Sequence, residues 1–425
     1  MKVATIFASI LYLTGLCFAN VIYVPSDQPT IQAAVDIALE GDTILVAPGT
    51  YTGDGNRDIG FNGKNLVVKS ENGPELTTID CGSYEDHYYR AFILAENQDN
   101  TAVIDGFTIT GAYSEGFGAG ILVSASSPTI KNCIFEWILH DNHYGSAIGC
   151  DKGSDAVIYN CIFRSNFSIS GAVACHNSSP RIINCLFERN DGQFAAGAIH
   201  LNANSNPHIL KCVFYANQSD GDGGTIACYE SNPIIESCTF IRNRANEGVG
   251  AVIFSELSNP VIHSSILAFS VEGDAIYGNA DLECTNIFGN EGGDWVGNIA
   301  DQDGLDGNMS VDPLFCSLAD SNLYLDIMSP CLPDNNSCET LIGRFGAGCN
   351  VACGDINQDT EKNIQDVVLL VNYIFEDGEI PQPSINADVT CDDKINITDI
   401  VFLIDYIFRE GSAPCDSDGD GIPDC

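Results

Sequence analysis

The chain has 425 residues, of which 58 are Asp or Glu and 17 are Lys or Arg, and its formal net charge is −41. This charge excludes nucleic acid as a partner, because nothing in the chain would neutralise a phosphate backbone, and it favours the binding of cations. The length ahead of the acidic C-terminal part exceeds that of a typical globular domain, which favours a repeat architecture.

The first predicted element is a signal peptide over residues 1–19. Lys2 supplies a positive charge, a largely apolar run follows, and Ala19 is a small residue suited to cleavage. The apolar run is too short for a membrane span, and no later segment is apolar enough to cross a bilayer. We therefore expect a secreted, extracellular protein, free or associated with a cell surface. Removal of Cys17 with the leader leaves 18 of the 19 cysteines in an oxidising compartment.

Residues 20–349 carry a unit of about 26 residues that repeats along the chain. Each unit holds three short β-type runs, and the turns between them are too short for a helical crossover between parallel strands. A coil whose rungs stack about 4.8 Å apart satisfies this pattern, with one Ile, one Cys and one Phe of each unit in the interior. The repeated positions are Cys133, Cys161, Cys185, Cys212 and Cys238, followed two residues later by Phe135, Phe163, Phe187, Phe214 and Phe240.

Two sets of asparagines recur in step with this unit. Asn132, Asn160 and Asn184 fall between the inward Ile and the inward Cys, where a residue that tolerates the left-handed conformation lets the chain bend sharply. A second set follows each Phe by three residues and predicts a ladder of stacked amides that bond to one another. Its members are Asn166, Asn190, Asn217 and Asn243.

The cysteine column of the repeat is interpreted as a packed interior ladder of thiols. Adjacent rungs are close enough for a disulfide, so pairing within the column stays open. Five further cysteines in the closing part of the coil are better disulfide candidates, and the sequence does not say which of them pair. They are Cys316, Cys331, Cys338, Cys349 and Cys353.

The segment 20–349 resembles the right-handed parallel β-helix of the pectin-lyase-like superfamily. The similarity begins with the segments 23–35 and 40–51, which in that family form an N-terminal capping helix leading into the first rung. It continues at Gly106-Phe-Thr-Ile-Thr-Gly111, a rung signature, and ends in a closing segment over 312–349. The resemblance implies an all-β coil with a capping helix and leaves the activity open.

Enzymes of this superfamily work on one outward sheet face, with clustered carboxylates or with calcium and a basic residue. Alternate residues after each strand-opening Gly outline that face as Ala172, Ala174, His176, Ala198, His200, Asn202, Thr225, Ala227, Tyr229, Ala251, Ile253 and Ser255. The outline holds no carboxylate pair for glycoside hydrolysis and no Lys or Arg to remove a sugar-ring proton, so catalytic residues stay unassigned. His176, His200 and Tyr229 are the predicted substrate-binding residues. The alternative is that the two histidines are ordinary surface residues.

The C-terminal part contains almost the same loop and helix twice, over residues 355–375 and 388–408. Each copy places oxygen-bearing side chains at positions 1, 3, 5, 9 and 12 of a loop and continues into an apolar helix. This is the ligand pattern of an EF-hand calcium loop. Residues 353–425 hold 17 Asp and Glu against 3 Lys and Arg, and calcium would relieve the repulsion among them.

Residues 350–412 resemble a type I dockerin, a small α-helical domain that binds one calcium ion in each loop and docks onto a cohesin domain. The resemblance implies that the first ion takes the main-chain carbonyl of Glu361 and the side chains of Asp355, Asn357, Asp359, Asn363 and Asp366. It implies that the second takes the main-chain carbonyl of Lys394 and the side chains of Asp388, Thr390, Asp392, Asn396 and Asp399. Residues 413–425 resemble a shortened thrombospondin type 3 repeat, which implies a further ion at Asp416, Asp418, Asp420 and Asp424.

Two functions are consistent with these features. The pairing of modules favours a secreted β-helix protein that binds or degrades polysaccharide and is anchored through its calcium-dependent dockerin to a cohesin-bearing partner. An enzyme of this kind would be a polysaccharide lyase or a glycoside hydrolase. The alternative is a non-catalytic cell-surface or adhesion protein that uses the coil as a rigid scaffold. For the dockerin itself, the simplest alternative is a calcium-stabilised module without a partner.

Overall fold

The computed structural model describes residues 19–83, 87–246, 248–319 and 321–349, and in the C-terminal part residues 353–357, 359, 361–375, 378, 381, 384–390, 392, 394–409, 411, 412 and 414. The predicted signal peptide lies outside these ranges except for Ala19. The predicted Asp-rich tail lies outside them except for Pro414, so its four candidate calcium ligands are not described.

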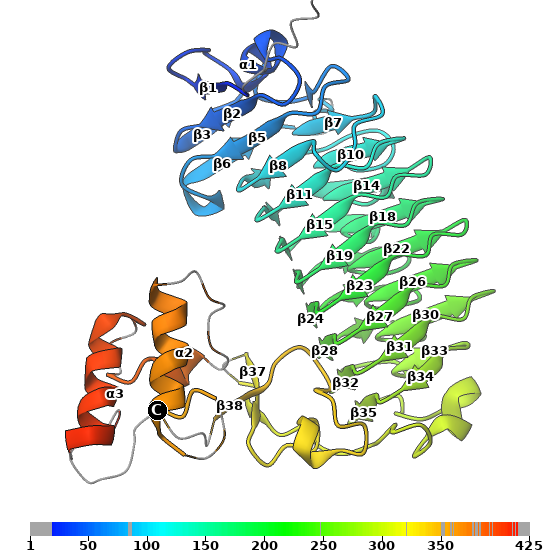
Figure 1. The fold of residues 1–425 in the computed structure, drawn as a ribbon. Coiled ribbons are helices and arrows are strands. Elements are labelled where there is room, and N and C mark those ends of the chain that lie inside the picture. The colour runs from blue at the N-terminus through cyan, green and yellow to red at the C-terminus, as the bar shows by residue number, and fades with distance from the viewer. Residues whose placement is uncertain are drawn as a thin grey trace, which may run out of the picture.

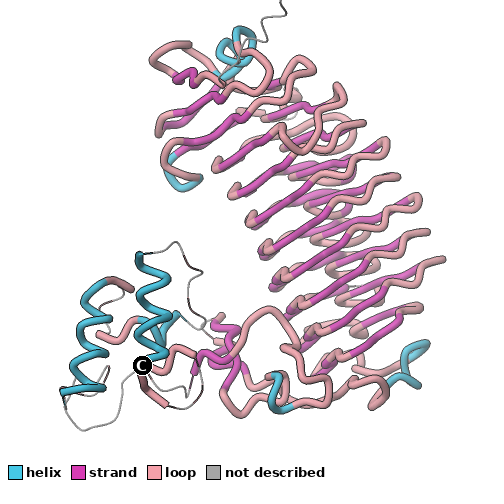
Figure 2. The backbone as a smooth tube through the Cα atoms, in the orientation of Figure 1, coloured by secondary structure: helices cyan, strands magenta, loops and turns pink. Residues whose placement is uncertain are grey.

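Most of the chain forms one parallel β-coil, in which each short strand pairs with the strand at the same position one rung further along (Figure 1, Figure 2). The described residues of the coil build four parallel sheets, here named A, B, C and D in the order in which the chain passes through a rung. The coil confirms the all-β parallel fold that the repeat predicts.

The strands of the four sheets are short and follow one another along the coil. Sheet A contains β1 (Val21–Val24), β2 (Thr43–Val46), β5 (Val67–Ser70), β8 (Val103–Asp105), β11 (Thr129–Lys131), β15 (Val157–Tyr159), β19 (Arg181–Ile183), β23 (His208–Leu210), β27 (Ile234–Glu236), β31 (Val261–His263) and β34 (Asp281–Glu283). Sheet B contains β3 (Gly49–Thr52), β6 (Thr77–Asp80), β9 (Thr108–Thr110), β12 (Ile134–Glu136), β16 (Ile162–Arg164), β20 (Leu186–Glu188), β24 (Val213–Tyr215), β28 (Thr239–Ile241), β32 (Ile266–Ala268) and β35 (Asn286–Phe288). Sheet C contains β13 (Leu139–Tyr144), β17 (Phe167–Ser170), β21 (Asp191–Gly192), β25 (Gln218–Ser219) and β29 (Arg244–Ala245). Sheet D contains β4 (Ile59–Gly60), β7 (Phe92–Leu94), β10 (Ile121–Ser124), β14 (Ile148–Asp151), β18 (Val173–His176), β22 (Ile199–Asn202), β26 (Ile226–Tyr229), β30 (Ile253–Glu256) and β33 (Ile276–Tyr277).

The helix α1 (Ile31–Ile37) confirms the predicted cap at the N-terminal end of the coil (Figure 1). Thr30 precedes its first turn in an extended conformation and accepts a hydrogen bond from the N–H of Ala33 at 3.2 Å, which satisfies one of the unpaired donors of that turn. Its apolar side, which includes Ile31 and Val35, is buried and joins the interior of the coil. The helix therefore covers side chains that the first rung would otherwise expose to water.

Columns of identical side chains fill the interior, as the repeat predicts. Neighbouring rings of the column from Phe135 to Phe240 stack with centroids 4.5–4.9 Å apart and with planes 3–10° from parallel. The cysteines from Cys133 to Cys238 are buried and their thiols are free, so the alternative of disulfides within this column is wrong. A further set of free, buried cysteines on sheet D lies outside the predicted column. It comprises Cys150, Cys175 and Cys228.

The outer set of asparagines makes the bend between sheets A and B. Asn132, Asn160 and Asn184 have φ values of 53°, 52° and 55°, in the left-handed region that lets the chain turn sharply. Their amides also bond to one another, because Asn160 donates to Asn132 at 2.8 Å and Asn184 donates to Asn160 at 3.1 Å. The predicted bend is confirmed, and the side chains add a hydrogen-bonded row along the outside of the coil.

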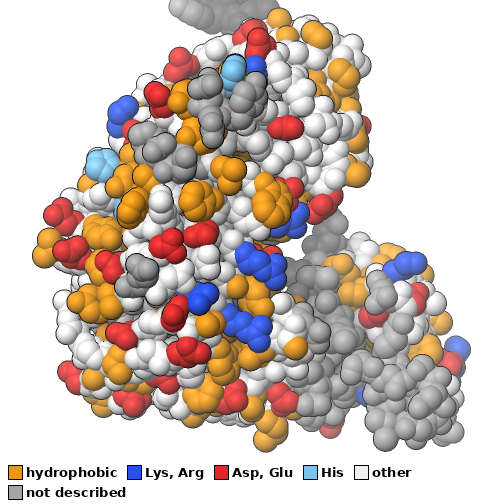
Figure 3. Space-filling model, turned by 180° about the vertical axis from the view of Figure 1, so that it is seen from behind, with side chains coloured by type: hydrophobic (Ala, Val, Ile, Leu, Met, Phe, Trp, Pro, Cys, Tyr) orange, Lys and Arg blue, Asp and Glu red, His pale blue; other side chains and the backbone are white. Residues whose placement is uncertain are grey.

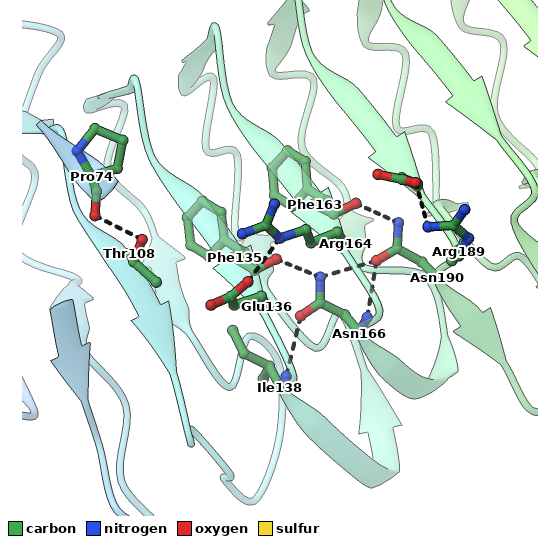
Figure 4. A network of polar contacts seen from close by, with 11 residues as sticks. Pro74, Thr108, Phe135, Glu136, Ile138, Phe163, Arg164, Asn166, Arg189 and Asn190 are labelled. Carbon is green, nitrogen blue, oxygen red and sulfur yellow. Dashed lines mark hydrogen bonds and ion pairs between the residues drawn. The ribbon is translucent and has the colours of Figure 1, made fainter. Parts of the chain in front are cut away.

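The inner set of asparagines forms the predicted amide ladder (Figure 4). The Nδ2 of Asn166 donates to the carbonyl of Phe135 at 2.9 Å and to Oδ1 of Asn190 at 3.0 Å. The same two kinds of bond recur at Asn190 and at Asn217. Each rung thereby satisfies polar groups that its turn between sheets B and C buries.

A closing segment covers part of sheet B near the C-terminal end of the coil. It contains a small sheet E of β36 (Phe315–Ser317), β37 (Asn322–Asp326) and β38 (Ala347–Cys349). Leu325 and Ile342 of this segment pack with Val213 and Ile241 of sheet B. The short 3-10 helices are η1 (Pro74–Leu76), η2 (Gly297–Gln302), η3 (Pro333–Asn335) and η4 (Ser384–Ala387).

The disulfide predictions for the closing segment are partly right. Cys338 is bonded to Cys284, which was not among the candidates, and Cys316 and Cys353 are also disulfide-bonded. Cys331 is a free and buried thiol, so its prediction as a disulfide cysteine is wrong. The side chain of Cys349 lies outside the described part of the structure.

Two helices, α2 (Ile364–Phe375) and α3 (Ile397–Arg409), lie side by side beyond the closing segment (Figure 1). They bury Leu370 and Leu403 in a small apolar core that is separate from the interior of the coil. No helix within the described ranges is long and apolar enough to cross a membrane.

Candidate functional site

Sheet D presents the outward face on which the predicted binding residues lie. Gly171, at the entrance to β18, has a φ of 75°, and a Cβ there would lie 2.7 Å from the carbonyl oxygen of Val173 and 2.9 Å from the main-chain nitrogen of His200. Glycine is therefore required for the tight turn into this strand. The strand then alternates, with Cys175 in the interior and His176 exposed.

The predicted outline of this face is right within the strands β18, β22 and β26 and wrong for β30, and it is also wrong for Ala172 and Ala198, which precede their strands and join the interior. In β30, Ile253 joins the interior, and Ser255 lies on the same side, so Phe254 and Glu256 take the outward positions. The outline slips by one position because two residues separate Gly250 from this strand, whereas one residue does so in the three preceding rungs. The face therefore carries the carboxylate of Glu256, which the predicted outline omits.

Seven aromatic rings form a continuous row along this face, here called the aromatic track. Each ring lies 4.8–6.0 Å from a neighbouring ring, measured between centroids. At one end His176 contacts Phe117, and at the other end Tyr277 stacks on Phe254 with an angle of 3° between the planes. The members are Phe117, Tyr144, His176, His200, Tyr229, Phe254 and Tyr277.

The track contains the three predicted binding residues and four that the sequence analysis missed. Phe117 and Tyr144 each stand directly before a strand-opening glycine, and this repeated pair of residues is a signal that could have found them. Phe254 was missed because the predicted outline is displaced by one residue in β30. Tyr277 follows the last predicted repeat of the face, and nothing in the outline pointed to it.

Two adjoining hollows lie along the track, and together they are here called the groove. The first, of about 450 Å³, is lined by His200 and Tyr229 together with the exposed Phe194. The second, of about 250 Å³, is lined by Glu230 and Glu256 and shares Tyr229 with the first. Aromatic walls with a few polar groups are typical of ligand-binding sites. His176 lies on the track but not in the lining of the groove.

His200 is held in one orientation by a serine on the neighbouring sheet C. Its Nδ1 lies 2.7 Å from the hydroxyl oxygen of Ser170, and that hydroxyl donates to the carbonyl of Ala195. Because the serine proton is used in this way, Nδ1 of His200 carries the hydrogen and donates to the serine. Burial, with a smaller effect from His176, lowers the pKa of His200 to about 4, so the ring is neutral at neutral pH. The alternative interpretation of His200 as a surface residue is wrong, since it is only 5% exposed.

The stability of the coil should depend on pH through His200. In the unfolded chain this side chain gains a proton below its ordinary pKa of about 6.5, whereas the folded protein resists protonation down to about 4. Stability should therefore be highest above pH 6.5 and fall by roughly 2–4 kcal/mol between pH 6.5 and 4. Free energies of unfolding across this range should fall less steeply for His200→Gln. Parallel curves for the two proteins would contradict the assignment.

The two C-terminal loops repeat one pattern of hydrogen bonds to their predicted calcium ligands. In the first loop, Asp366 accepts from the main-chain N–H groups of Asn357 at 3.0 Å and Asn363 at 2.8 Å. Asp355 and Asp359 accept from N–H groups at 3.1 and 2.9 Å. The second loop reproduces these bonds at Asp399, Asp388 and Asp392. These hydrogen bonds hold the main chain of each loop around its carboxylates, which is the arrangement of a calcium loop of the EF-hand type.

The predicted ligands also begin the two helices. Asn363 accepts from the N–H of Gln365 at 2.8 Å, while Asp366 reaches back to the N–H of Asn363, which is the reciprocal pattern of a capping box. Asn396 and Asp399 do the same for α3. The same residues therefore form the N-terminal cap of each helix and belong to the predicted calcium loop before it.

The donor sets of the loops fit calcium rather than a softer metal. They combine carboxylate, amide, hydroxyl and main-chain oxygens, which are ligands that hard cations prefer. Within the described residues, no three His, Cys, Asp or Glu side chains form a group that could hold a metal ion by themselves. The predicted sets would be completed by the side chains of Asn357, Asn363, Thr390 and Asn396 and by the carbonyls of Glu361 and Lys394.

Fold and loops together define a parallel β-solenoid protein with a C-terminal pair of EF-hand-like loops. Residues 91–288 match the family described as the right handed beta helix region, and residues 353–408 match the dockerin type I domain. The chain thus carries a right-handed β-helix followed by a type I dockerin, and both predictions are confirmed. Dockerin type I domains bind calcium, and such a domain implies a cohesin partner. No curated protein matches the chain.

Several solved structures are similar to the coil. Pectate lyase Pel9A has 14% identity and a TM-score of 0.45, with 79% of this chain and 98% of that chain covered. Geobacillus virus E2 ORF18 has 14% identity and a TM-score of 0.37, with 60% and 56% covered. The A-module of Azotobacter vinelandii mannuronan C-5 epimerase AlgE6 has 12% identity and a TM-score of 0.31, with 67% and 94% covered. At these identities the similarity concerns the fold alone.

Proposed function

We propose that this protein binds a polysaccharide along its aromatic track and is held outside the cell, through its dockerin, by a cohesin-bearing partner. The observation that carries the glycan part is the unbroken row of seven rings beside the groove. The exposed parts of these rings offer apolar surface to the C–H groups of sugars, while the side chains of Asn202, Glu230 and Glu256 can bond to sugar hydroxyls. A linear polymer suits a row that continues over several rungs.

The geometry supports binding better than cleavage. A general base works best when its pKa lies near the working pH, and burial leaves the pKa of His200 at about 4. His200 is therefore poorly suited to remove a proton from a sugar. We accordingly assign no catalytic residue, and the proposal does not include a lyase or hydrolase activity.

The anchoring part of the proposal uses the exposed sides of α2 and α3. Four apolar side chains of α2 are exposed, and for three of them the duplication places an exposed apolar side chain at the matching position of α3. Exposed apolar side chains gathered on a small domain mark an interaction surface, which favours a protein partner over a module without one. The pairs are Ile364 with Ile397, Val368 with Val401, and Phe375 with Phe408.

The proposal divides the chain into a leader over 1–19, the coil over 20–349, the dockerin over 350–412 and an Asp-rich tail over 413–425. Each dockerin loop holds one calcium ion through the ligands predicted from its spacing, and the tail holds a further one. Export follows from the leader, and attachment outside the cell follows from the dockerin.

Truncation of a ring at the exposed end of the track tests the glycan part. Tyr277 is 47% exposed on the track, and Tyr159, on sheet A, is 43% exposed, so the two form a matched pair. Tyr277→Ala should weaken glycan binding about tenfold or more, while Tyr159→Ala should leave it unchanged. Affinity electrophoresis and calorimetry with neutral and acidic glycans would measure both.

Two results would contradict the proposal. If no glycan in the panel binds, the coil is better explained as a scaffold in a surface or adhesion protein. If Tyr159→Ala weakens binding as much as Tyr277→Ala does, the ligand does not lie on the track. Sugar release or unsaturated products during the same incubations would add a catalytic activity to the binding function.

A further inference from the structure

We infer that the aromatic track takes a neutral polysaccharide and discriminates against polyuronates. This inference rests on the proposed function and names its substrate class. It follows from the charges that line and surround the groove, which carries carboxylates and no described basic side chain.

The lining of the groove is acidic or uncharged. Its described acidic residues are Glu230 and Glu256, and its one described histidine, His200, is neutral at neutral pH. No Lys or Arg is among the described lining residues. Burial raises the pKa of Tyr229 to about 12, with smaller contributions from the carboxylates of Asp222 and Glu256, so two negative charges act on the centre of the track.

Basic side chains near the ends and side of the track are already engaged. Arg90 donates to main-chain carbonyls, including that of Gly118 at 2.8 Å. Lys152 lies 3.8 Å from Asp151, and Arg244 lies 2.7 Å from Glu272. A uronate would have to compete with the contacts of Arg90 and Arg244, and beside Lys152 it would also meet the carboxylate of Asp151.

Other basic side chains of the coil belong to a different face. Figure 3 shows Lys and Arg gathered in one area of the rear face, while acidic side chains are spread over the surface. On and beside sheet B, Arg164 pairs with Glu136 at 2.7 Å and Arg189 pairs with Glu188 at 2.6 Å (Figure 4). These two arginines therefore lie on and beside sheet B, away from the track on sheet D.

The sizes of the electrostatic interactions favour the binding of neutral sugars. Two like charges about 4 Å apart in water repel one another enough to reduce affinity about fivefold for each pair. A sugar hydroxyl at the same place instead donates a charge-assisted hydrogen bond to the carboxylate.

Polymers that share a backbone and differ in charge test the inference on the full chain. Hydroxyethyl cellulose and carboxymethyl cellulose form one pair, and methyl-esterified and de-esterified polygalacturonate form another. In each pair we expect the neutral member to bind at least about fivefold more tightly at low salt. The difference should shrink as salt screens the charges, and it should shrink in the variant Glu230→Gln/Glu256→Gln.

The outcomes separate this inference from the proposed function. Equal or tighter binding of the acidic member at the track, including binding that requires added calcium, overturns the neutral-glycan inference and leaves the proposed function intact. Sensitivity to Tyr277→Ala would show that such binding occurs at the track. If no polymer of either charge binds, both the inference and the glycan part of the proposed function fail.

Discussion

Replacing Asp366 and Asp399 by alanine together is expected to abolish calcium binding by the dockerin, and each single substitution should remove one ion. Both carboxylates are fully buried, and each bonds to N–H groups at two separate points of its loop. Loss of an outer-shell partner lowers metal affinity roughly 10–100-fold, so loss of a direct ligand should lower it by more than about 100-fold. The N–H groups left without partners should also destabilise the start of each helix by about 1–3 kcal/mol.

Isothermal titration calorimetry would give the number of ions, and circular dichroism would give the helix content with and without calcium. Asp405→Asn is the matched control, because it removes a half-exposed carboxylate of the same domain that lies outside both loops and pairs with Arg409 at 3.5 Å. It should bind two calcium ions as the unchanged protein does. An unchanged ion count in the single variants would show that position 12 of each loop is not a ligand.

Phe187→Ala is expected to give the largest loss of stability in the coil. Its ring is buried between those of Phe163 and Phe214, at centroid distances of 4.6 and 4.9 Å, so both stacking contacts disappear with it. Truncation of a buried Phe typically costs about 3–5 kcal/mol. In a solenoid each rung contacts only its neighbours. The substitution should therefore weaken the contacts of this rung with the rungs of Phe163 and Phe214, which join the N-terminal and C-terminal parts of the coil.

Guanidinium unfolding followed by intrinsic fluorescence and by circular dichroism would measure the effect. Phe194→Ala is the matched control, since that ring is 63% exposed and its loss should change the free energy of unfolding by less than about 0.5 kcal/mol. Similar losses in the two variants would mean that the stacked column does not stabilise the coil beyond ordinary burial of apolar area.

Several features could be predicted because they recur at fixed spacing. The interior positions of Phe187 and Cys185 follow from the repeat, and neighbouring rungs give independent evidence for each position. The bend at Asn184 and the amide of Asn190 follow in the same way. The loop pattern is more local still, since Asp355 and Asp366 lie within one loop and no tertiary contact is needed to bring them together.

Other features depend on how rungs stack and could not be read along the chain. The bond between Cys284 and Cys338 joins residues 54 positions apart in the sequence, and only the path of the closing segment brings them together. The slip at Ile253 came from a single additional residue after Gly250, which no spacing rule marked. The contact of Tyr144 with His200 joins rings whose separation in sequence reveals nothing about their distance in space.

By itself the sequence determined the class of fold, the interior columns, the two asparagine sets and the pair of loops, because each of these arises from a short pattern repeated in register. The tertiary structure alone decided the continuity of the aromatic track, the neutral and buried state of His200 and the acidic lining of the groove. These properties depend on side chains of different rungs that meet across the surface, and on how much water their neighbours exclude. The order of residues along the chain specifies neither these contacts between rungs nor the exclusion of water around them.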